Sequence, residues 1–284
     1  MNNYQLEEIV KTLLPHFRKM VKGKYAIALG GSHAKGYADS YSDIDFYVYT
    51  EDVIEFSDRK KIIENIANKD QDVYIEESID KNIWGASTDF YYQSTKIEST
   101  FKSLIRVSNN IQNCLAGKIE IEHTVWTLYG YYNYICLAEV NFIRAIEDPY
   151  QIISDWKEQI KTYPKELKKA IINEFWWKAN FWLDNFHYKT AIKRCDFVYT
   201  SGIIQHTVHS FVQVLFALNE SYFNGDKKIE EQLQKLRNCP RLFTENIEYL
   251  LSVYRDEEML NNQRSILLEI ASSIKEMMIE LLQF

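Results

Sequence analysis

The sequence has no excess of positive charge. It contains 33 Lys and Arg against 40 Asp and Glu, which gives a formal net charge of −7, and neither residues 1–117 nor the remainder is basic. A protein that binds a nucleic-acid backbone usually presents a positive surface, because contacts to phosphates supply much of the affinity. The composition therefore disfavours DNA or RNA as a partner and favours a small or cationic ligand.

Paired cysteines and long apolar runs are also missing. The cysteines Cys114, Cys136, Cys195 and Cys239 form no C-x-x-C pair and have no His at metal-ligand spacing, so we expect reduced thiols. No window of about 18 apolar residues could span a membrane. The first residues lack the basic and apolar regions of a secretory signal. These absences predict a cytoplasmic protein with no membrane partner.

The secondary-structure pattern changes near Gly117. Before it, helical periodicity alternates with short strand-like runs; after it, we expect helices only. This predicts an α+β protein with a mixed-sheet domain over 1–117 and an all-helical domain over 118–284, without an internal repeat. The expected strands are 24–29, 44–49, 72–75 and 96–101, and the expected helices are 4–22, 57–68, 104–115, 121–147, 165–185, 189–219, 226–237, 242–255 and 258–283.

Two aspartates near the front of the chain form the clearest chemical signal. Asp43 and Asp45 are separated by Ile44 at the start of an expected strand. Side chains alternate along a strand, so both carboxylates point to one face while Ile44 and Phe46 point into the core. Mg²⁺ is usually bound by one or two carboxylates together with substrate phosphates. Two such ions can flank a phosphoryl group that is being transferred.

A glycine turn stands just before the aspartates. Gly30 and Gly31 end an apolar run and allow the backbone to approach a phosphate closely. The N–H groups of the short helix that follows would point at anions. Ser32 adds a hydroxyl donor, and Lys35 could neutralise a phosphate. A glycine turn followed by Asp-x-Asp is a stronger signal than either half alone.

The stretch GGSHAKGYADSYSDID resembles the signature of the DNA polymerase beta-like nucleotidyltransferase superfamily. The most similar branch is the kanamycin-nucleotidyltransferase-like and minimal nucleotidyltransferase group, here with a C-terminal helical domain. The resemblance is specific over residues 25–50. It implies that Gly31 and Ser32 grip the β- and γ-phosphates and that Asp43 and Asp45 bind metal. With them we group Gly30, Lys35 and Ser42 as nucleotide-binding residues.

The same resemblance implies a third carboxylate on a neighbouring strand. Glu98 is our candidate because it lies on the strand-like segment 96–101, where relatives often carry Asp. It would bind metal or take the proton from the acceptor hydroxyl. Asp72, Glu76 and Asp89 are the alternatives.

Together these features predict a Mg²⁺-dependent transferase, with two ions, that moves AMP from ATP onto a hydroxyl of a small molecule. An acidic protein suits a cationic acceptor, such as an aminoglycoside-type antibiotic, which would connect the chain with antibiotic resistance. Acids within the expected helices are the candidate acceptor-binding residues: Asp196, Glu139 and Glu174. The alternatives are a protein-modifying, antitoxin-like adenylyltransferase and a non-catalytic nucleotide-binding regulator.

Overall fold

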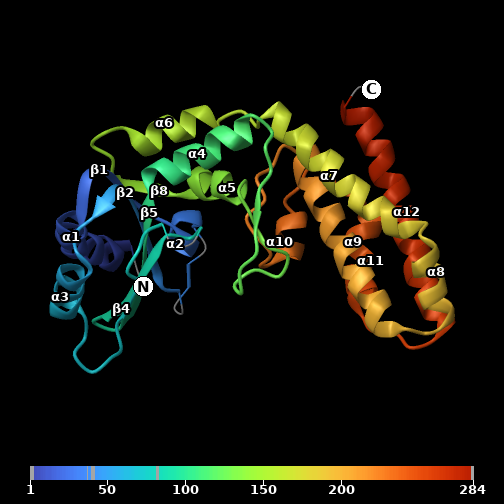
Figure 1. The fold of residues 1–284 in the computed structure, drawn as a ribbon, viewed down its shortest axis with the longest axis horizontal. Coiled ribbons are helices and arrows are strands. Elements are labelled where there is room, and N and C mark those ends of the chain that lie inside the picture. The colour runs from blue at the N-terminus through green and yellow to red at the C-terminus, as the bar shows by residue number, and fades with distance from the viewer. Residues whose placement is uncertain (1–2, 37, 40–41, 81–82, 283–284) are drawn as a thin grey trace. The chain divides into compact units, whose positions relative to one another are not determined.

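The computed structural model describes residues 3–36, 38–39, 42–80 and 83–282 (Figure 1). The chain forms two compact units. The first consists of Met1–Gln112 and Asn133–Thr162, and the second of Asn113–Tyr132 and Tyr163–Phe284. The segment 133–162 thus belongs with the sheet, whereas the sequence pattern places it in the helical domain.

A mixed six-stranded sheet is the centre of the first unit. Its strand order is β3-β4-β5-β2-β1-β8, in which β2 and β5 run parallel and the other neighbours run antiparallel (Figure 1). The strands are β1 Val21–Leu29, β2 Ile44–Val53, β3 Tyr74–Ile75, β4 Ala86–Tyr92, β5 Thr95–Ser103 and β8 Arg144–Glu147. The helices are α1 Asn3–Met20, α2 Gly31–Lys35, α3 Phe56–Ile66, α4 Leu104–Leu115, α5 Ile135–Phe142 and α6 Ile152–Gln159.

One face of this sheet is apolar and carries the main core. Ile44, Phe46 and Val48 of β2 point to this face and are fully buried. Helices α1 and α3 supply the opposing side chains, and the ring centroids of Phe17 and Phe46 are 4.8 Å apart. Because side chains alternate along a strand, Asp45 and Tyr47, which lie between these residues, point to the opposite face of the sheet.

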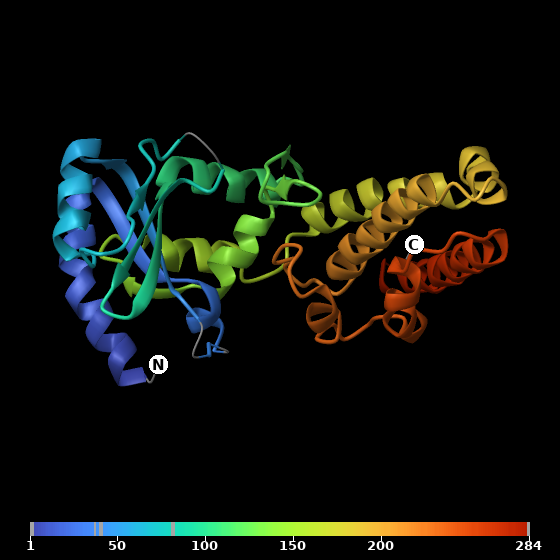
Figure 2. The same ribbon diagram turned by 90° about the horizontal axis from the view of Figure 1, so that it is seen from below.

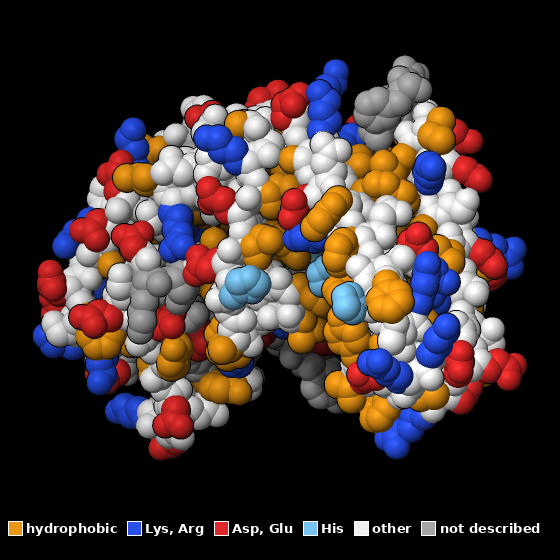
Figure 3. Space-filling model, turned by 45° about the vertical axis from the view of Figure 1, so that its right-hand side comes forward, with side chains coloured by type: hydrophobic (Ala, Val, Ile, Leu, Met, Phe, Trp, Pro, Cys, Tyr) orange, Lys and Arg blue, Asp and Glu red, His pale blue; other side chains and the backbone are white. Residues whose placement is uncertain are grey.

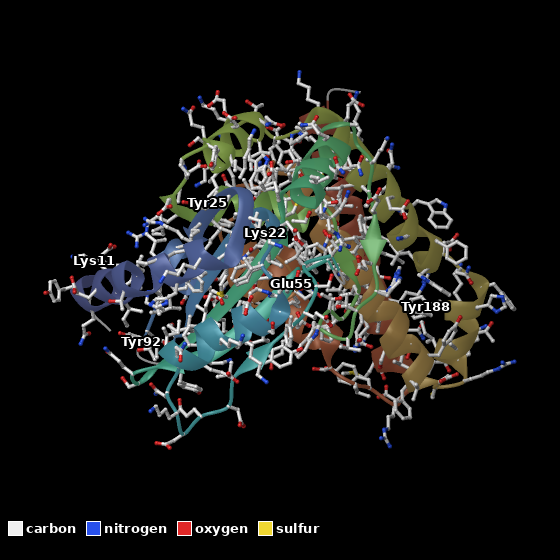
Figure 4. The ribbon with its side chains drawn as sticks, turned by 60° about the vertical axis from the view of Figure 1, so that its left-hand side comes forward. Lys11, Lys22, Tyr25, Glu55, Tyr92 and Tyr188 are labelled. Atoms are coloured by element: carbon white, nitrogen blue, oxygen red, sulfur yellow. The ribbon has the colours of Figure 1, made fainter. Side chains whose placement is uncertain are left out.

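The segment 133–162 completes the first unit. Strand β8 pairs with β1 as an edge strand, and the carboxylate of Glu147 accepts hydrogen bonds from Arg18 of α1 and from Tyr25 of β1, which is labelled in Figure 4. The predicted helix over 121–147 is therefore wrong, as is the expectation that no strand follows residue 119. Residues 144–147 become a strand because β1 offers an unpaired edge, which is a tertiary effect that helical periodicity does not report.

The second unit is mainly helical (Figure 2). Helices α7 and α9 form its closest pair, and α8, α11 and α12 also pack on α9. The expected helix over 189–219 breaks at Cys195, whose φ of 52° is left-handed. The elements are β6 Ile121–Glu122, β7 Tyr131–Tyr132, α7 Lys165–Leu183, α8 Phe186–Lys193, α9 Phe197–Leu218, α10 Ile229–Leu233, α11 Arg241–Leu251 and α12 Glu257–Leu282. These two units confirm the α+β class.

Among the helices that the structure describes, none combines the length and the apolar character that crossing a membrane requires.

We predict that Trp156→Ala destabilises the first unit by about 3–5 kcal/mol, the usual cost of emptying a large aromatic site in a core. Trp156 of α6 is 4% exposed, packs edge-on against Tyr49 of β2 with centroids 5.0 Å apart, and donates a hydrogen bond to Ser108. Denaturant unfolding followed by circular dichroism measures the change. Trp126→Ala is the matched control, because Trp126 is 83% exposed; equal stability of the two variants would contradict the assignment of 133–162 to the sheet.

Candidate active site

Three carboxylates lie in register across adjacent strands of the sheet. Asp45 of β2 is opposite Glu98 of β5, and Glu98 is opposite Asp89 of β4. Residues directly opposite each other in a sheet project from the same face. All three acids therefore point away from the apolar core, in a row that the pairing of β2, β5 and β4 creates.

Asp43 extends this row at the start of β2. It has the same parity as Asp45, and it lies close enough to Glu98 that the two carboxyl groups interact. Partial burial, followed by the neighbouring charge of Glu98, raises the pKa of Asp43 above its ordinary value. Lys96 forms an ion pair with Glu98 and offsets part of this negative charge.

The glycine turn packs directly against the acidic row. The backbone N–H of Gly30 donates to the carbonyl of Asp45 at 2.9 Å. Gly31 has a φ of 53°, and a Cβ there would lie 1.7 Å from Oδ2 of Asp45. Only glycine can occupy this position without displacing the carboxylate. The turn and the aspartate, 14 residues apart, are thus adjacent in space.

Ser32 follows the turn with its hydroxyl buried. Neither Ser32 Oγ nor His33 Nε2 has a hydrogen-bond partner within the described part of the chain. A buried polar atom without a partner costs free energy, so such an atom in a native structure often marks a place where a ligand binds. The Ser32 hydroxyl could donate to a phosphate oxygen next to the acidic row.

The other two expected nucleotide-binding residues lie on either side of this region. Lys35 ends α2, and its Nζ lies 5.4 Å from the ring centroid of Phe142. Ser42 is occupied locally, since its Oγ donates to Asp39 Oδ1 at 3.0 Å and accepts from the Asp39 N–H at 2.9 Å. Ser42 thereby shapes the approach to Asp43.

The donor set of the row suits a hard cation bound together with a ligand. Within the regions that the structure describes, no three His, Cys, Asp or Glu side chains converge to enclose a metal by themselves. Mg²⁺ does not require this, because phosphate and water oxygens normally complete its shell. The mutual repulsion of Asp43, Glu98 and Asp89 is also what a bound cation would relieve.

Of the alternatives to Glu98, only Asp89 joins the row. Burial, and then the charge of Glu98, raises the pKa of Asp89 to about 6. Glu76 accepts hydrogen bonds from the Ser87 N–H and the Tyr74 hydroxyl outside the row, and Asp72 is exposed. The pairing of β4 with β5, which places Asp89 opposite Glu98, could not be predicted from the position of Asp89 in the sequence.

The three candidate acceptor-binding acids are dispersed. Asp196 is the N-cap of α9, and its carboxylate accepts from the Tyr199 N–H; it does not lie inside a helix as its apolar neighbours indicate. Glu174 is exposed on α7 and paired with Lys178 at 2.8 Å. Glu139 belongs to the first unit, in a buried ion pair with Lys102.

A buried histidine forms the polar centre of the second unit. His209 Nε2 lies 2.8 Å from the Tyr132 hydroxyl, Tyr129 stacks on the ring with centroids 3.9 Å apart, and burial lowers the pKa of His209 to about 3. His209 is therefore a packed residue of the core.

Apolar side chains also gather on the surface of the second unit (Figure 3). Those exposed on α7 and the elements after it include Trp177, Phe181 and Phe186.

Comparison with known proteins agrees with this geometry. Residues 6–103 match the family described as "Nucleotidyltransferase domain", and residues 133–229 match a "Domain of unknown function (DUF4037)". The nucleotidyltransferase match thus covers the part of the chain that carries the glycine turn and the acidic row.

The comparison with solved structures includes a crystal structure of a nucleotidyltransferase-like protein from Exiguobacterium sibiricum 255-15. It has 10% identity and a TM-score of 0.48, and the match covers 98% of this chain and 80% of that one. No curated protein matches the chain.

We predict that Asp89→Asn stabilises the protein by about 1 kcal/mol at pH 8 and has no effect near pH 4. A pKa shift of about two units corresponds to a larger change in the free energy of unfolding, but solvent around the half-buried side chain screens the charge interactions and reduces this change. The folded-state pKa of about 6 lies above the ordinary value of 3.8. Ionisation of Asp89 therefore opposes folding, and its stabilising protonated form is lost as the pH rises through 6. Denaturant unfolding at both pH values, with exposed Asp70→Asn as control, measures this. An equal effect of Asp89→Asn at pH 4 and pH 8 would rule out the ionisation of Asp89 as the cause.

Proposed function

We propose that the protein transfers AMP from ATP, with two Mg²⁺ ions, to a hydroxyl group of a small molecule. The observation that carries this proposal is the contact between the glycine turn and the acidic row. Gly31 lies against the Asp45 carboxylate, and the buried Ser32 hydroxyl next to it has no partner in the described chain. Phosphate oxygens placed there would meet a hydroxyl donor on one side and cation-binding carboxylates on the other.

The proposed roles follow from these positions. Asp43 and Asp45 would hold Mg²⁺, which supplies charge neutralisation at the phosphates and a more acidic acceptor hydroxyl. Ser32 and the backbone of Gly30 and Gly31 orient the triphosphate. The acceptor oxygen bonds to the α-phosphorus as the bond to the bridging oxygen breaks and pyrophosphate leaves. Glu98 takes the hydroxyl proton or completes the metal shell. Positioning and charge stabilisation provide most of the rate enhancement.

A groove beside Asp43 offers room for a second substrate. Its volume is about 610 Å³, and it lies between the start of α1, the β4–β5 hairpin and the segment before β2. Tyr4, Glu8 and Tyr92 line it together with Asp43, and Tyr92 stands at the end of β4 (Figure 4). Carboxylates and tyrosine faces can bind amines, which supports an amine-bearing acceptor of the aminoglycoside type.

We predict that Asp45→Asn lowers nucleotidyl transfer by at least about 10²- to 10³-fold, the usual effect of removing one group that stabilises transition-state charge. The assay uses ATP labelled at the α-phosphate, Mg²⁺ and a panel of hydroxyl-bearing antibiotics, with mass spectrometry of the products. Asp58→Asn, an exposed change on α3, is the control. A parental rate in Asp45→Asn would refute the assignment of the site.

We predict that Ser32→Ala weakens nucleotide binding by about 10- to 100-fold, because a hydrogen bond to a charged group contributes about 1.5–3 kcal/mol. The unpartnered hydroxyl adds nothing to folding, so thermal stability should stay the same or rise slightly. Calorimetry with a non-hydrolysable ATP analogue and Mg²⁺ measures the affinity. Unchanged affinity, together with unchanged stability, would exclude a phosphate contact by Ser32.

A further inference from the structure

A buried ion pair lies on the same face of the sheet as the acidic row. Lys102 of β5 and Glu139 of α5 are joined at 2.7 Å between Nζ and Oε2, with side chains 6% and 13% exposed. Burying two charges costs more solvation than their attraction generally returns, so such pairs contribute little to net stability. Their placement therefore needs another explanation.

The ion pair holds the ring of Tyr47. Lys102 Nζ lies 4.7 Å from the centroid of that ring, a cation–π distance. Tyr47 is two residues beyond Asp45 on β2 and points to the same face, between Ala28 of β1 and Thr100 of β5. Tyr47 thus connects the ion pair with the region of the glycine turn.

The Tyr47 ring is also in contact with the turn. A Cβ at Gly30 would lie 2.7 Å from Cε2 and Cζ of Tyr47, so the Gly30 backbone rests on the ring. Gly30 is in turn hydrogen-bonded to Asp45, and Ser32 follows two residues later. A displacement of the ring would move the turn and the serine hydroxyl relative to the Asp45 carboxylate.

We propose that Lys102 and Glu139 are positioning residues of the nucleotide site, which hold Tyr47 beneath Gly30 and so set the distance between the Ser32 hydroxyl and the Asp45 carboxylate. This inference rests on the proposed function. It gives Glu139 a role beneath the site in place of acceptor binding. It also means that the region matched to the domain of unknown function supplies part of the nucleotide site, since Glu139 lies outside residues 6–103.

The decisive variant is the double substitution Lys102→Met with Glu139→Met. Replacing both charges by apolar side chains avoids an unpaired buried charge, so we expect the melting temperature to stay close to that of the parent. The loosened ring should raise the Kd for a non-hydrolysable Mg·ATP analogue by about tenfold, since small displacements in a supporting shell weaken a site.

Substitutions at Tyr47 test the same inference without touching the charges. Tyr47→Phe keeps the ring and should bind the analogue like the parent, whereas Tyr47→Leu removes it and should show the tenfold loss. The control pair is Lys168→Met with Glu220→Met, an ion pair of 2.9 Å in the second unit, which should leave the Kd unchanged.

The outcomes separate the two proposals. If the parent and the Lys102/Glu139 double variant bind the analogue equally, or if Tyr47→Leu binds like Tyr47→Phe, the positioning role is overturned while the proposed function stands. If the parent binds no nucleotide in the presence of Mg²⁺, both are overturned. Weaker binding confined to the double variant and Tyr47→Leu, with melting temperatures retained, supports the inference.

Discussion

The arrangement of the site depends on the register between β2 and β5. Because Asp45 stands opposite Glu98, and Glu98 opposite Asp89, three carboxylates share one face of the sheet. A shift of one residue would turn one member into the apolar core. The register is maintained by the other face, where Ile44, Phe46 and Ile97 are fully buried. The energy of the apolar core thus holds together acids that repel one another.

This repulsion makes the acidic row energetically unfavourable in the protein alone. Asp43 and Asp89 have raised pKa values, and the buried Ser32 hydroxyl has no partner in the described chain. The interactions of these three groups are therefore incomplete in the protein alone. Functional sites often depart in this way from what stability alone would favour. The segment 133–162 contributes β8 to the sheet and Glu139 to the ion pair with Lys102, so the family match over 6–103 does not delimit the structural unit.

The sequence was a good guide where the signal is local. Strand alternation places Asp43 and Asp45 on one face, and the glycine pair predicts a turn; both features are present. It was a poor guide where the structure depends on distant partners. Residues 144–147 form a strand because β1 provides an edge, and Asp196 caps a helix because Cys195 breaks the chain direction. Neither event has a signature in the local periodicity of apolar residues.

The sequence by itself determined the α+β class, the glycine turn followed by two carboxylates, and the nucleotidyltransferase resemblance, because each rests on the spacing of neighbouring residues. Only the tertiary structure decided that Asp89 joins Glu98, that Gly31 lies against Asp45, and that Lys102 meets Glu139. These pairs are 9 to 37 residues apart in the chain, and strand pairing and helix packing bring them together. Periodicity reports which face a residue occupies but not which residue it will meet there.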